Sequence, residues 1–543
     1  MWLATMGGRY RRALHAARTM AVGTRTLLLA VAMLLVAALF RLPACRSRDL
    51  IERRFYRRKY DAAGTLEAVV PRLRDEVDST LGRPSWWCGS RQHAAWSRVP
   101  VAAGNLMRSH RRRLLKRSRG WMTLAVLCLA PVLLWGLAHP LAERFATPAS
   151  ALKSLANVAA LVGTAALAVT LVLGSRLRVV ERLFVGLDRM YRAHRSLGLA
   201  AVSLVVLHAL LLVLSRTPFS GLSGWSLFTP GAGWRIFVGV VALAGLLAGV
   251  TLTLFARMRH ETFVRVHKSL GIVFLVASVH VFVVSGTKAS SRPLTVYLAL
   301  LTVLALVAFA RRSLFGRLLI RRHRYRVEGV NRLAEDAVEI VLAWEGDRLR
   351  FQPGQFVFVR FGELGGEAHP FSITSAPDEA AVRLVVKALG DHTGALMDLP
   401  PGGSAELEGP YGTLSHLAFA NTRQVWIAGG IGITPFLSMA RSLDGTGHQI
   451  DLYYCTAAAD HAYFLEELFQ VADRNPRVRV IPIRKVDLGR LSADDIEGAS
   501  RDLPEKEILI CGPPVMIRNL TGQLRARGVP RGRIHYEDFS FLS

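Results

Sequence analysis

The chain has 543 residues, enough for two or three domains, and 51% of them are hydrophobic although the formal net charge is +29 at pH 7. A basic excess of this size is typical of proteins that bind nucleic acid or a membrane surface; the long apolar runs argue against nucleic acid and indicate a membrane. The five cysteines include no CxxC pair, so neither a thiolate-bound iron–sulfur centre nor a disulfide framework is expected. They are Cys45, Cys88, Cys128, Cys455 and Cys511.

Residues 1–118 are expected to form a basic N-terminal appendage with one short apolar segment. That segment, at 27–40, is shorter than a membrane-spanning helix and has basic residues on both sides. Three interpretations stay open for it: a signal-like segment, a seventh helix, or a helix lying in the membrane interface. The stretch at 51–78 is charged and helix-prone, and Met107 with the basic run behind it would make a natural cytoplasmic start for the helices that follow.

Six long apolar stretches, almost free of charge, follow between about residue 120 and residue 310. A helix rises about 1.5 Å per residue, so roughly 20 apolar residues cross a bilayer, and two of the six are short enough to need tilt or local thinning. Buried helices of a large soluble core are the alternative, but six in a row without amphipathic alternation favour a transmembrane bundle at 119–315. The stretches are 121–138, 151–173, 197–214, 236–255, 270–284 and 294–310.

Basic residues are distributed unevenly among the loops of this bundle. They gather before the first span, between the second and third, between the fourth and fifth, and after the sixth. Because cytoplasmic loops are enriched in Lys and Arg, both ends of the bundle are expected to face the cytoplasm, in a multi-pass protein of the plasma membrane. Spans three and five then run parallel, from inside to outside.

Four histidines lie on these two parallel spans, His194 and His208 on span three and His267 and His280 on span five. Ionisable residues inside a membrane are costly and are functional candidates by default. The spacings of 14 and 13 residues correspond to about 20 Å along a helix, which separates two depths. The flank of His194, YRAHRSLG, also resembles the flank of His267, VRVHKSLG. The sequence therefore predicts that His194 faces His267 and that His208 faces His280.

Two neutral imidazoles that face each other form a bis-axial site for a planar iron porphyrin. We expect Gly198 and Gly271, each one turn beyond an inner histidine, to leave room for the macrocycle. Nearby cations are expected to pair with its propionates. They are Arg192, Arg195, Arg265 and Lys268.

The two histidine spacings do not fit a helix equally well. A step of 14 residues returns to nearly the same face, whereas a step of 13 ends about 140° away, so a π-bulge or bend is expected in span five. Polar core histidines that bond to neighbouring helices are the alternative interpretation. A di-metal carboxylate site is disfavoured, because these spans hold no Asp or Glu.

From about Tyr325 the sequence changes to short alternating β-rich runs, which predicts an antiparallel barrel at 322–418. The segment His369-Pro370-Phe371-Ser372-Ile373-Thr374 ends one run; its hydroxyl and backbone N–H groups suit the edge of a flavin ring, and its imidazole suits the flavin's phosphates. The turn Gly390-Asp391-His392-Thr393-Gly394 offers N–H groups to a pyrophosphate, with Lys387 nearby. Alone, each motif is a weak signal, and an ordinary turn is the default interpretation.

From about Arg423, strands alternate with helical stretches, which predicts an α/β nucleotide-binding domain at 423–543. In the loop after its first strand, Gly429, Gly430 and Gly432 let a dinucleotide phosphate approach the backbone where a helix begins near Thr434. Cys511, followed by Gly512 and Pro513, lies at the carboxyl end of another strand, where ligands bind in such sheets; a buried inert cysteine is the alternative. Near the C-terminus, Phe539 offers an aromatic ring to a flavin.

Taken in order, these motifs resemble the ferric reductase / NADPH oxidase superfamily, whose members join a ferric-reductase-like membrane domain to a ferredoxin–NADP reductase-like FAD and nicotinamide module. The resemblance covers about 119–543. It implies FAD on the barrel, with contacts from His369, Phe371, Ser372 and Thr374. It further implies that Cys511 lies near the nicotinamide, that Phe539 covers the isoalloxazine, and that two b-type haems bind the pairs His194/His267 and His208/His280.

Two details refine the resemblance. His369 stands where many soluble relatives carry Arg. The membrane members of the superfamily also carry His at this position. Residues 456–460 contain no basic side chain for the 2′-phosphate of NADPH, which leans weakly towards NADH.

The expected protein is a multi-domain membrane oxidoreductase: a six-helix transmembrane bundle, then an antiparallel FAD-binding β-barrel and an α/β nucleotide-binding domain. Electrons from cytoplasmic NADH or NADPH are expected to pass through FAD and two b-type haems to an external acceptor, oxygen or a ferric or other metal chelate. The alternative is a membrane electron-relay subunit that feeds a quinone or a protein partner. The sequence identifies no protein partner.

Overall fold

The computed structural model of the chain describes residues 103–138, 140–216, 225–258, 260–284, 291–365, 368–457 and 462–539. The apolar segment at 27–40, the charged stretch at 51–78, Cys45 and Cys88 lie outside the described residues. The chain divides into two compact units. The helical unit contains Met122–Gly174 and Ala193–Phe309, and the two-sheet unit contains Ser109–Trp121, Ser175–Arg192 and the chain from Ala310 onwards.

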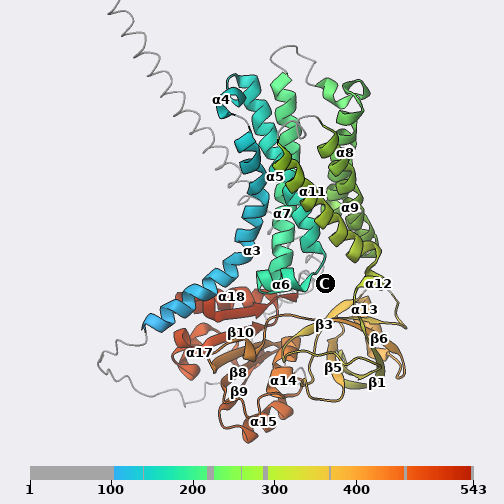
Figure 1. Cartoon of the computed structure of the whole chain (residues 1–543). Coiled ribbons are helices and arrows are strands. Elements are labelled where there is room, and N and C mark those ends of the chain that lie inside the picture. Colours follow the sequence, from blue (N-terminus) through green and yellow to red (C-terminus); the bar gives the residue numbers. More distant parts are fainter. Residues whose placement is uncertain are drawn as a thin grey trace, which may run out of the picture. The chain divides into compact units, whose positions relative to one another are not determined.

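The helical unit is built from long apolar helices that lie side by side (Figure 1). Among the described residues, six helices are long and apolar enough to cross a membrane, which confirms the six predicted spans. Helix α8 packs against α9, and α5 packs against α11. The helices are α3 (Ala103–Ala138), α5 (Pro148–Gly174), α7 (Leu187–Arg216), α8 (Trp234–Phe255), α9 (His260–Val283) and α11 (Arg292–Phe309).

Apolar side chains cover the outside of this bundle as well as its inside. Leu133 is 64% exposed and Leu300 is 68% exposed, whereas Ala156, Val162 and Ala165 are fully buried between helices. Small residues let helix backbones approach closely, and large apolar residues on the outer surface suit a hydrocarbon solvent. The distribution is therefore that of helices packed together inside a bilayer.

The expected π-bulge in span five is wrong. Helix α9 is α-helical from His260 to Val283, and the π-helical turn, η4, lies instead at Ala310–Leu314, after α11. His267 and His280 therefore leave α9 about 140° apart around its axis.

The first sheet of the two-sheet unit is the predicted barrel, found as a curled antiparallel sheet in the order β4-β3-β6-β1-β2-β5. Its ends approach each other at a bridge between Ile373 and Leu384. Alternate residues of the strands point inward to a core that includes Val327, Ile340 and Val357. The strands are β1 (His323–Ala334), β2 (Ala337–Trp344), β3 (Phe356–Phe361), β4 (His369–Ser372), β5 (Val382–Lys387) and β6 (Ser404–Tyr411).

The second sheet is parallel throughout, in the order β11-β10-β7-β8-β9, and confirms the predicted α/β domain. Its central strands are buried along their whole length, which explains their continuous apolar sequence. The strands are β7 (Arg423–Gly429), β8 (Gln449–Thr456), β9 (Val478–Arg484), β10 (Glu507–Cys511) and β11 (Ile534–Glu537). The helices of this domain are α14 (Thr434–Ala440), α15 (Leu465–Arg474), α16 (Lys485–Leu488), α17 (Ala493–Ser500) and α18 (Pro514–Ala526), and the short helices elsewhere are α4 (Leu141–Arg144), α6 (Arg178–Phe184), α12 (Gly316–Leu319) and α13 (Asp391–Ala395).

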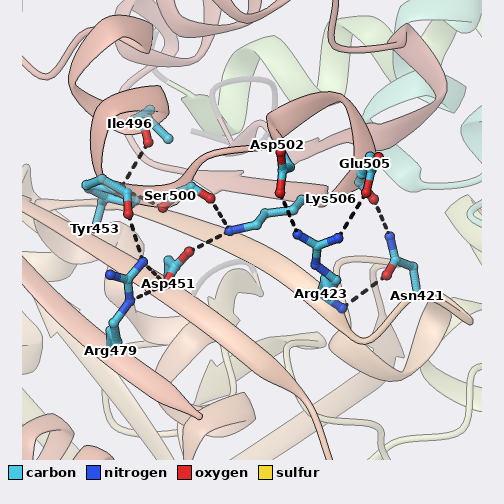
Figure 2. Close-up of polar contacts among 11 residues, drawn as sticks. Asn421, Arg423, Asp451, Tyr453, Arg479, Ile496, Ser500, Asp502, Glu505 and Lys506 are labelled. Atoms are coloured by element: carbon cyan, nitrogen blue, oxygen red, sulfur yellow. Dashed lines mark hydrogen bonds and ion pairs between the residues drawn. The ribbon is translucent and has the colours of Figure 1, made fainter. Parts of the chain in front are cut away.

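A polar network ties the strands of this sheet together near their amino ends (Figure 2). The buried Lys506 pairs with Asp451 at 2.9 Å, and Arg479 pairs with the same carboxylate at 2.6 Å. Arg423 pairs with Asp502 and Glu505. Because these charges satisfy one another at the edge opposite the strands' carboxyl ends, the network supports the sheet and leaves the other edge for ligands.

Candidate functional site

The structure brings the two inner histidines together. The ring centroids of His194 on α7 and His267 on α9 lie 5.8 Å apart, with the rings inclined at 61°. The Nδ1 atom of His194 lies 2.9 Å from the carbonyl oxygen of Thr170 on α5. A Cβ on Gly174, the last residue of α5, would lie 3.4 Å from the His194 ring, so the end of α5 borders this imidazole.

The two outer histidines are held in the same manner. Nδ1 of His208 lies 2.9 Å from the carbonyl oxygen of Ala156 on α5, and Nδ1 of His280 lies 2.8 Å from that of Arg235 on α8. A Cβ on Gly239 of α8 would lie only 2.6 Å from Nδ1 of His280, so the imidazole occupies the space that a side chain would fill.

These bonds fix how the rings are protonated. A carbonyl oxygen only accepts, so Nδ1 carries the hydrogen and Nε2 keeps the lone pair that a metal ligand needs. Two imidazoles on opposite sides of one metal, each bonded at about 2 Å, have centroids on the order of 6 Å apart, close to the spacing of His194 and His267. Among the described residues, no group of three His, Cys, Asp or Glu side chains could hold a bare metal ion. Two histidines suit a haem, because the porphyrin supplies the remaining ligands.

One sequence-based expectation about this site is wrong. Gly271 does not leave room for a macrocycle, because a Cβ there would overlap the ring of Phe309 on α11; the glycine permits close helix packing. Arg192 pairs with Asp188 at 2.7 Å, and its pairing with a propionate stays a prediction. Gly198 faces Thr170 at ordinary contact distance.

In the two-sheet unit, the two predicted flavin motifs meet. The rings of His369 on β4 and His392 in the Gly390–Gly394 turn stack with centroids 3.8 Å apart and planes 22° apart. Burial lowers the pKa of His392, and its Nε2 is buried without a partner. Stacked imidazoles beside a turn form a compact donor surface for phosphate oxygens.

Three of the predicted cofactor contacts also have partners within the protein. Thr393 accepts hydrogen bonds from the N–H groups of Leu389 and Gly390, so its hydroxyl stabilises the turn and the Gly390 N–H is occupied. Lys387 pairs with Asp336 at 3.0 Å. Phe371 lies in the barrel core and holds β4 in place.

Thr374 supplies an unpaired buried group. Its side chain is fully buried, and its Oγ1 has no hydrogen-bond partner in the structure. Ser372, two residues earlier, is also buried, and Pro370 lies on β4 beside Phe358. A buried hydroxyl without a partner costs free energy unless a ligand satisfies it, so this strand end fits the polar edge of a flavin ring.

The C-terminal aromatic residue lies beside this strand end. The ring of Phe539 packs edge-on against Phe356, 5.2 Å between centroids, and Phe356 is the β-sheet partner of Ser372. A small pocket is found here. It is lined by Leu187, Asp188, Phe356, Glu537, Asp538 and Phe539.

The glycine loops of the parallel sheet interlock at its carboxyl edge. Cys511 ends β10 between Ala428 on β7 and Glu537 on β11. A Cβ on Gly432 would lie 2.6 Å from the Cys511 carbonyl carbon, and one on Gly429 would lie 2.8 Å from Pro513. A Cβ on Gly512 would lie 3.0 Å from the Cα of Gly429. A hydrogen bond from the Thr434 hydroxyl to the Ile431 carbonyl closes the turn, and Gly430 has a left-handed φ of 54°. The predicted nucleotide loop and the Cys511 loop thus form one surface.

Glu537 is a site residue that the sequence analysis missed. Its Oε1 accepts hydrogen bonds from Thr413 N–H at 2.8 Å and Leu414 N–H at 3.3 Å, and its Oε2 is buried without a partner. Burial, reinforced by nearby carboxylates, raises the pKa of Glu537 to about 8. Burial also raises the pKa of the adjacent Cys511 thiol, which disfavours the thiolate that a nucleophile needs.

Arg484 is a second residue that was missed. It ends β9 and is the sheet partner of Thr456, which ends β8. Its guanidinium is half exposed and pairs with Asp487 at 2.6 Å. The absence of basic residues at 456–460 had suggested that the 2′-phosphate of NADPH has no partner. The parallel register, however, places the basic residue Arg484 beside Thr456. Residues 458–460 themselves lie outside the described residues.

Three family models match the chain in the order of these sites. A ferric reductase like transmembrane component matches residues 159–278, an FAD-binding domain matches 322–400, and an oxidoreductase NAD-binding domain matches 426–521.

Curated relatives match about two fifths of the chain. The reductase component of propane 2-monooxygenase from Rhodococcus jostii (strain RHA1) is 27% identical over 254 residues, which are 43% of this chain and 68% of that protein. The ferredoxin–NAD(+) reductase component of an alkene monooxygenase system from Xanthobacter autotrophicus is 28% identical, covering 40% of this chain and 70% of that protein. A flavohemoprotein from Chromobacterium violaceum is 30% identical, covering 35% of this chain and 53% of that protein.

Proposed function

We propose that this chain, a ferric reductase / NADPH oxidase-like fusion of a ferric-reductase-like transmembrane domain with FAD-binding and NAD-binding domains, carries electrons from NAD(P)H through FAD and two b-type haems to an acceptor across the membrane. The observation that carries the proposal is the pair His194 and His267, whose rings face each other at 5.8 Å. The bond from His194 to Thr170 leaves its Nε2 available to iron.

The protein's own part in this reaction is to hold and orient. When bound, FAD converts a hydride into single electrons and haem iron passes them on one at a time. The loops at Gly429–Gly432 and Gly512–Pro513 let the nicotinamide dinucleotide approach the backbone, and Cys511 gives its ring a neutral, apolar contact. The Thr374 hydroxyl and the His369–His392 stack hold the flavin.

Helix α7 begins with two residues that line the pocket beside Phe539 and also carries the inner histidine His194. Leu187 and Asp188, which line the pocket beside Phe539, begin this helix. His194 follows seven residues later, which is about 10 Å of helix rise. Helix α7 would therefore contribute both to the site beside Phe539 and to the inner haem site.

The basic loops before span one, between spans two and three, between spans four and five and after span six support an orientation with the FAD and NAD domains in the cytoplasm. The bundle then lies in the plasma membrane, with the His208 and His280 pair nearer the outer face. The proposed acceptor is oxygen or a ferric or other metal chelate on that side.

The acceptor is tested with purified protein in lipid nanodiscs and NAD(P)H. Oxygen reduction is expected to appear as cytochrome c reduction that superoxide dismutase inhibits, and metal reduction as ferrous chelate formation. A His208→Leu variant is expected to lose both activities, because its outer haem lacks a ligand, while its flavin is still reduced by NAD(P)H. Turnover with a quinone or an added protein alone would favour the electron-relay function instead.

The position of Arg484 supports NADPH as the preferred donor. A guanidinium beside Thr456, at the carboxyl edge of the sheet, suits the 2′-phosphate that distinguishes NADPH from NADH. An Arg484→Ala variant is expected to raise the KM for NADPH about tenfold, the effect of losing about 1.4 kcal/mol of binding free energy, and to leave the KM for NADH unchanged. Equal effects on both donors would contradict this role.

A further inference from the structure

The segment Gly412–Leu414, between β6 and β7, connects the two sheets of the two-sheet unit. Two buried carboxylates hold it. Glu537 accepts from the N–H groups of Thr413 and Leu414, and Glu181, on the short helix α6, accepts from the N–H of Gly412 at 3.0 Å. Each backbone N–H of Gly412, Thr413 and Leu414 is thus bonded to a glutamate.

Helix α6 belongs to the loop between the second and third predicted spans, and it contacts the same stretch at two further points. The Thr413 hydroxyl donates to the carbonyl of Val185 at 3.3 Å. The guanidinium of Arg178 donates to the carbonyl of Gly409 at the end of β6. Glu181 itself is only 6% exposed, so its contact with Gly412 is a buried one.

Gly412 is crowded from the other side by the residues of the flavin site. Its φ of 97° is in the left-handed region, and a Cβ there would lie 2.6 Å from Oε1 of Glu537 and 3.0 Å from the ring of Phe356. Phe356 in turn packs against Phe539. A shift of Gly412 therefore reaches Phe539 by two routes, through the Phe356 ring and through Glu537, which precedes Phe539 by two residues.

We propose that Glu181 is a positioning residue: by holding Gly412, it sets the place of Phe539 over the flavin site, so that a loop between two membrane spans tunes hydride transfer. This role rests on the proposed function. Glu181 touches neither the flavin site pocket nor the nicotinamide loops, and acts through Gly412, Phe356 and Glu537. A buried backbone N–H without an acceptor is costly in free energy, so loss of the Glu181 carboxylate would shift Gly412–Leu414 towards another acceptor.

The test uses the full-length protein with three variants. Glu181→Leu removes the acceptor, and Glu181→Gln keeps an oxygen in its place. Glu261→Leu removes an exposed glutamate from the first turn of α9 as the matched control. In stopped-flow experiments, Glu181→Leu is expected to slow flavin reduction by NAD(P)H about tenfold at unchanged flavin content, whereas Glu181→Gln and Glu261→Leu keep the normal rate.

A Phe539→Ala background distinguishes positioning from general destabilisation. If Glu181 acts through Phe539, then Glu181→Leu has no further effect on flavin reduction once Phe539 is absent, and the two losses are strongly non-additive. Additive losses would overturn the proposal, because they would show that Glu181 acts independently of the aromatic ring.

Hydrogen–deuterium exchange gives a readout that needs neither haem nor turnover. In Glu181→Leu, the amides of Gly412–Leu414 are expected to exchange faster than in the unaltered protein, and Glu181→Gln restores their protection. Unchanged exchange in Glu181→Leu would overturn the role of Glu181 even if the flavin is reduced normally. If Glu181→Leu speeds exchange but the flavin of the unaltered protein is not reduced by NAD(P)H, then Glu181 does hold Gly412 and the proposed function is refuted instead.

Discussion

Gly239 decides where the His280 imidazole can lie. The ring fills the space beside α8 that a side chain at this position would occupy, because a Cβ there would lie 2.6 Å from Nδ1. A Gly239→Ala variant is therefore expected to displace His280 and break its bond to the Arg235 carbonyl. Under the two-haem proposal, the purified variant loses about half of its Soret absorption, as a His280→Leu variant does.

The matched control is Gly136→Ala on α3, where a Cβ would meet nothing within 4 Å. It is expected to keep the full Soret absorption. A normal haem content in Gly239→Ala would show that His280 is not a ligand in the orientation seen here.

His416 makes the stability of the two-sheet unit depend on pH. Its side chain is fully buried, both ring nitrogens lack partners, and the ring of His448 lies 4.9 Å away. Burial first, and His448 second, lower the pKa of His416 to about 4 from 6.5. Between pH 6.5 and pH 4, His416 binds a proton in the unfolded chain but not in the folded chain. The free energy of unfolding is therefore unaffected by this residue above pH 6.5 and falls by about 3 kcal/mol as the pH drops to 4.

Thermal release of the flavin, followed by its fluorescence, measures this effect. The midpoint is expected to fall by roughly 6 to 12 °C between pH 7 and pH 4.5 from this residue alone, and a His416→Leu variant is expected to show a flatter pH profile. His323→Leu is the control, since His323 lies near the sheet surface with Nδ1 bonded to Asp347. An unchanged profile in His416→Leu would rule out this source of acid sensitivity.

At the scale of elements, the two glycine loops of the parallel sheet act as one piece. Gly432 lies against the backbone of Cys511, and backbone cannot move aside as a flexible side chain can. A Gly432→Ala variant is therefore expected to separate the loops and to raise the KM for NAD(P)H at least tenfold, or about 1.4 kcal/mol in binding free energy. Steady-state kinetics measure the change.

Gly498→Ala on α17 is the control, because a Cβ there meets nothing within 4 Å and alanine favours a helix over glycine. It is expected to leave the KM unchanged. A normal KM in Gly432→Ala would mean that the interlocked loops do not bind the dinucleotide.

Apolar period and turn chemistry predicted the six spans, the curled sheet and the parallel sheet, because these signals are local; α7 and α9 begin about ten residues before the apolar stretches that predicted them, since their first turns are charged. The inner pair His194 and His267 was also predicted, from parallel spans with repeated flanks. The glycine that makes room for His280 was not predicted, because Gly239 lies on another helix and nothing in its own segment marks it. The same holds for Arg484, which only strand register places beside Thr456.

The 13-residue step on α9 shows where helical period alone misleads. Period predicted a bulge that would bring His267 and His280 to one face, yet α9 is regular. His267 meets His194 on α7, and His280 turns to a carbonyl on α8. The two histidines of α9 therefore face two different helices, α7 and α8, and no distortion of α9 is needed.

At the scale of the whole molecule, the apolar surface and the distribution of basic residues both suit insertion in a membrane. The apolar outer surface of the bundle suits lipid, and under the proposed orientation the basic loops face the cytoplasm, where NAD(P)H is found. Haems held by histidines at two depths would then let electrons cross the membrane, and the two-sheet unit would supply those electrons from NAD(P)H.

The most direct measurement of this account is the optical spectrum of the purified chain in nanodiscs, loaded with FAD and haem, before and after anaerobic addition of NAD(P)H. Two haems for each FAD are expected, with a reduced b-type spectrum that appears only when FAD is present. A fully loaded preparation without Soret absorption, or with haem that NAD(P)H cannot reduce, would contradict it.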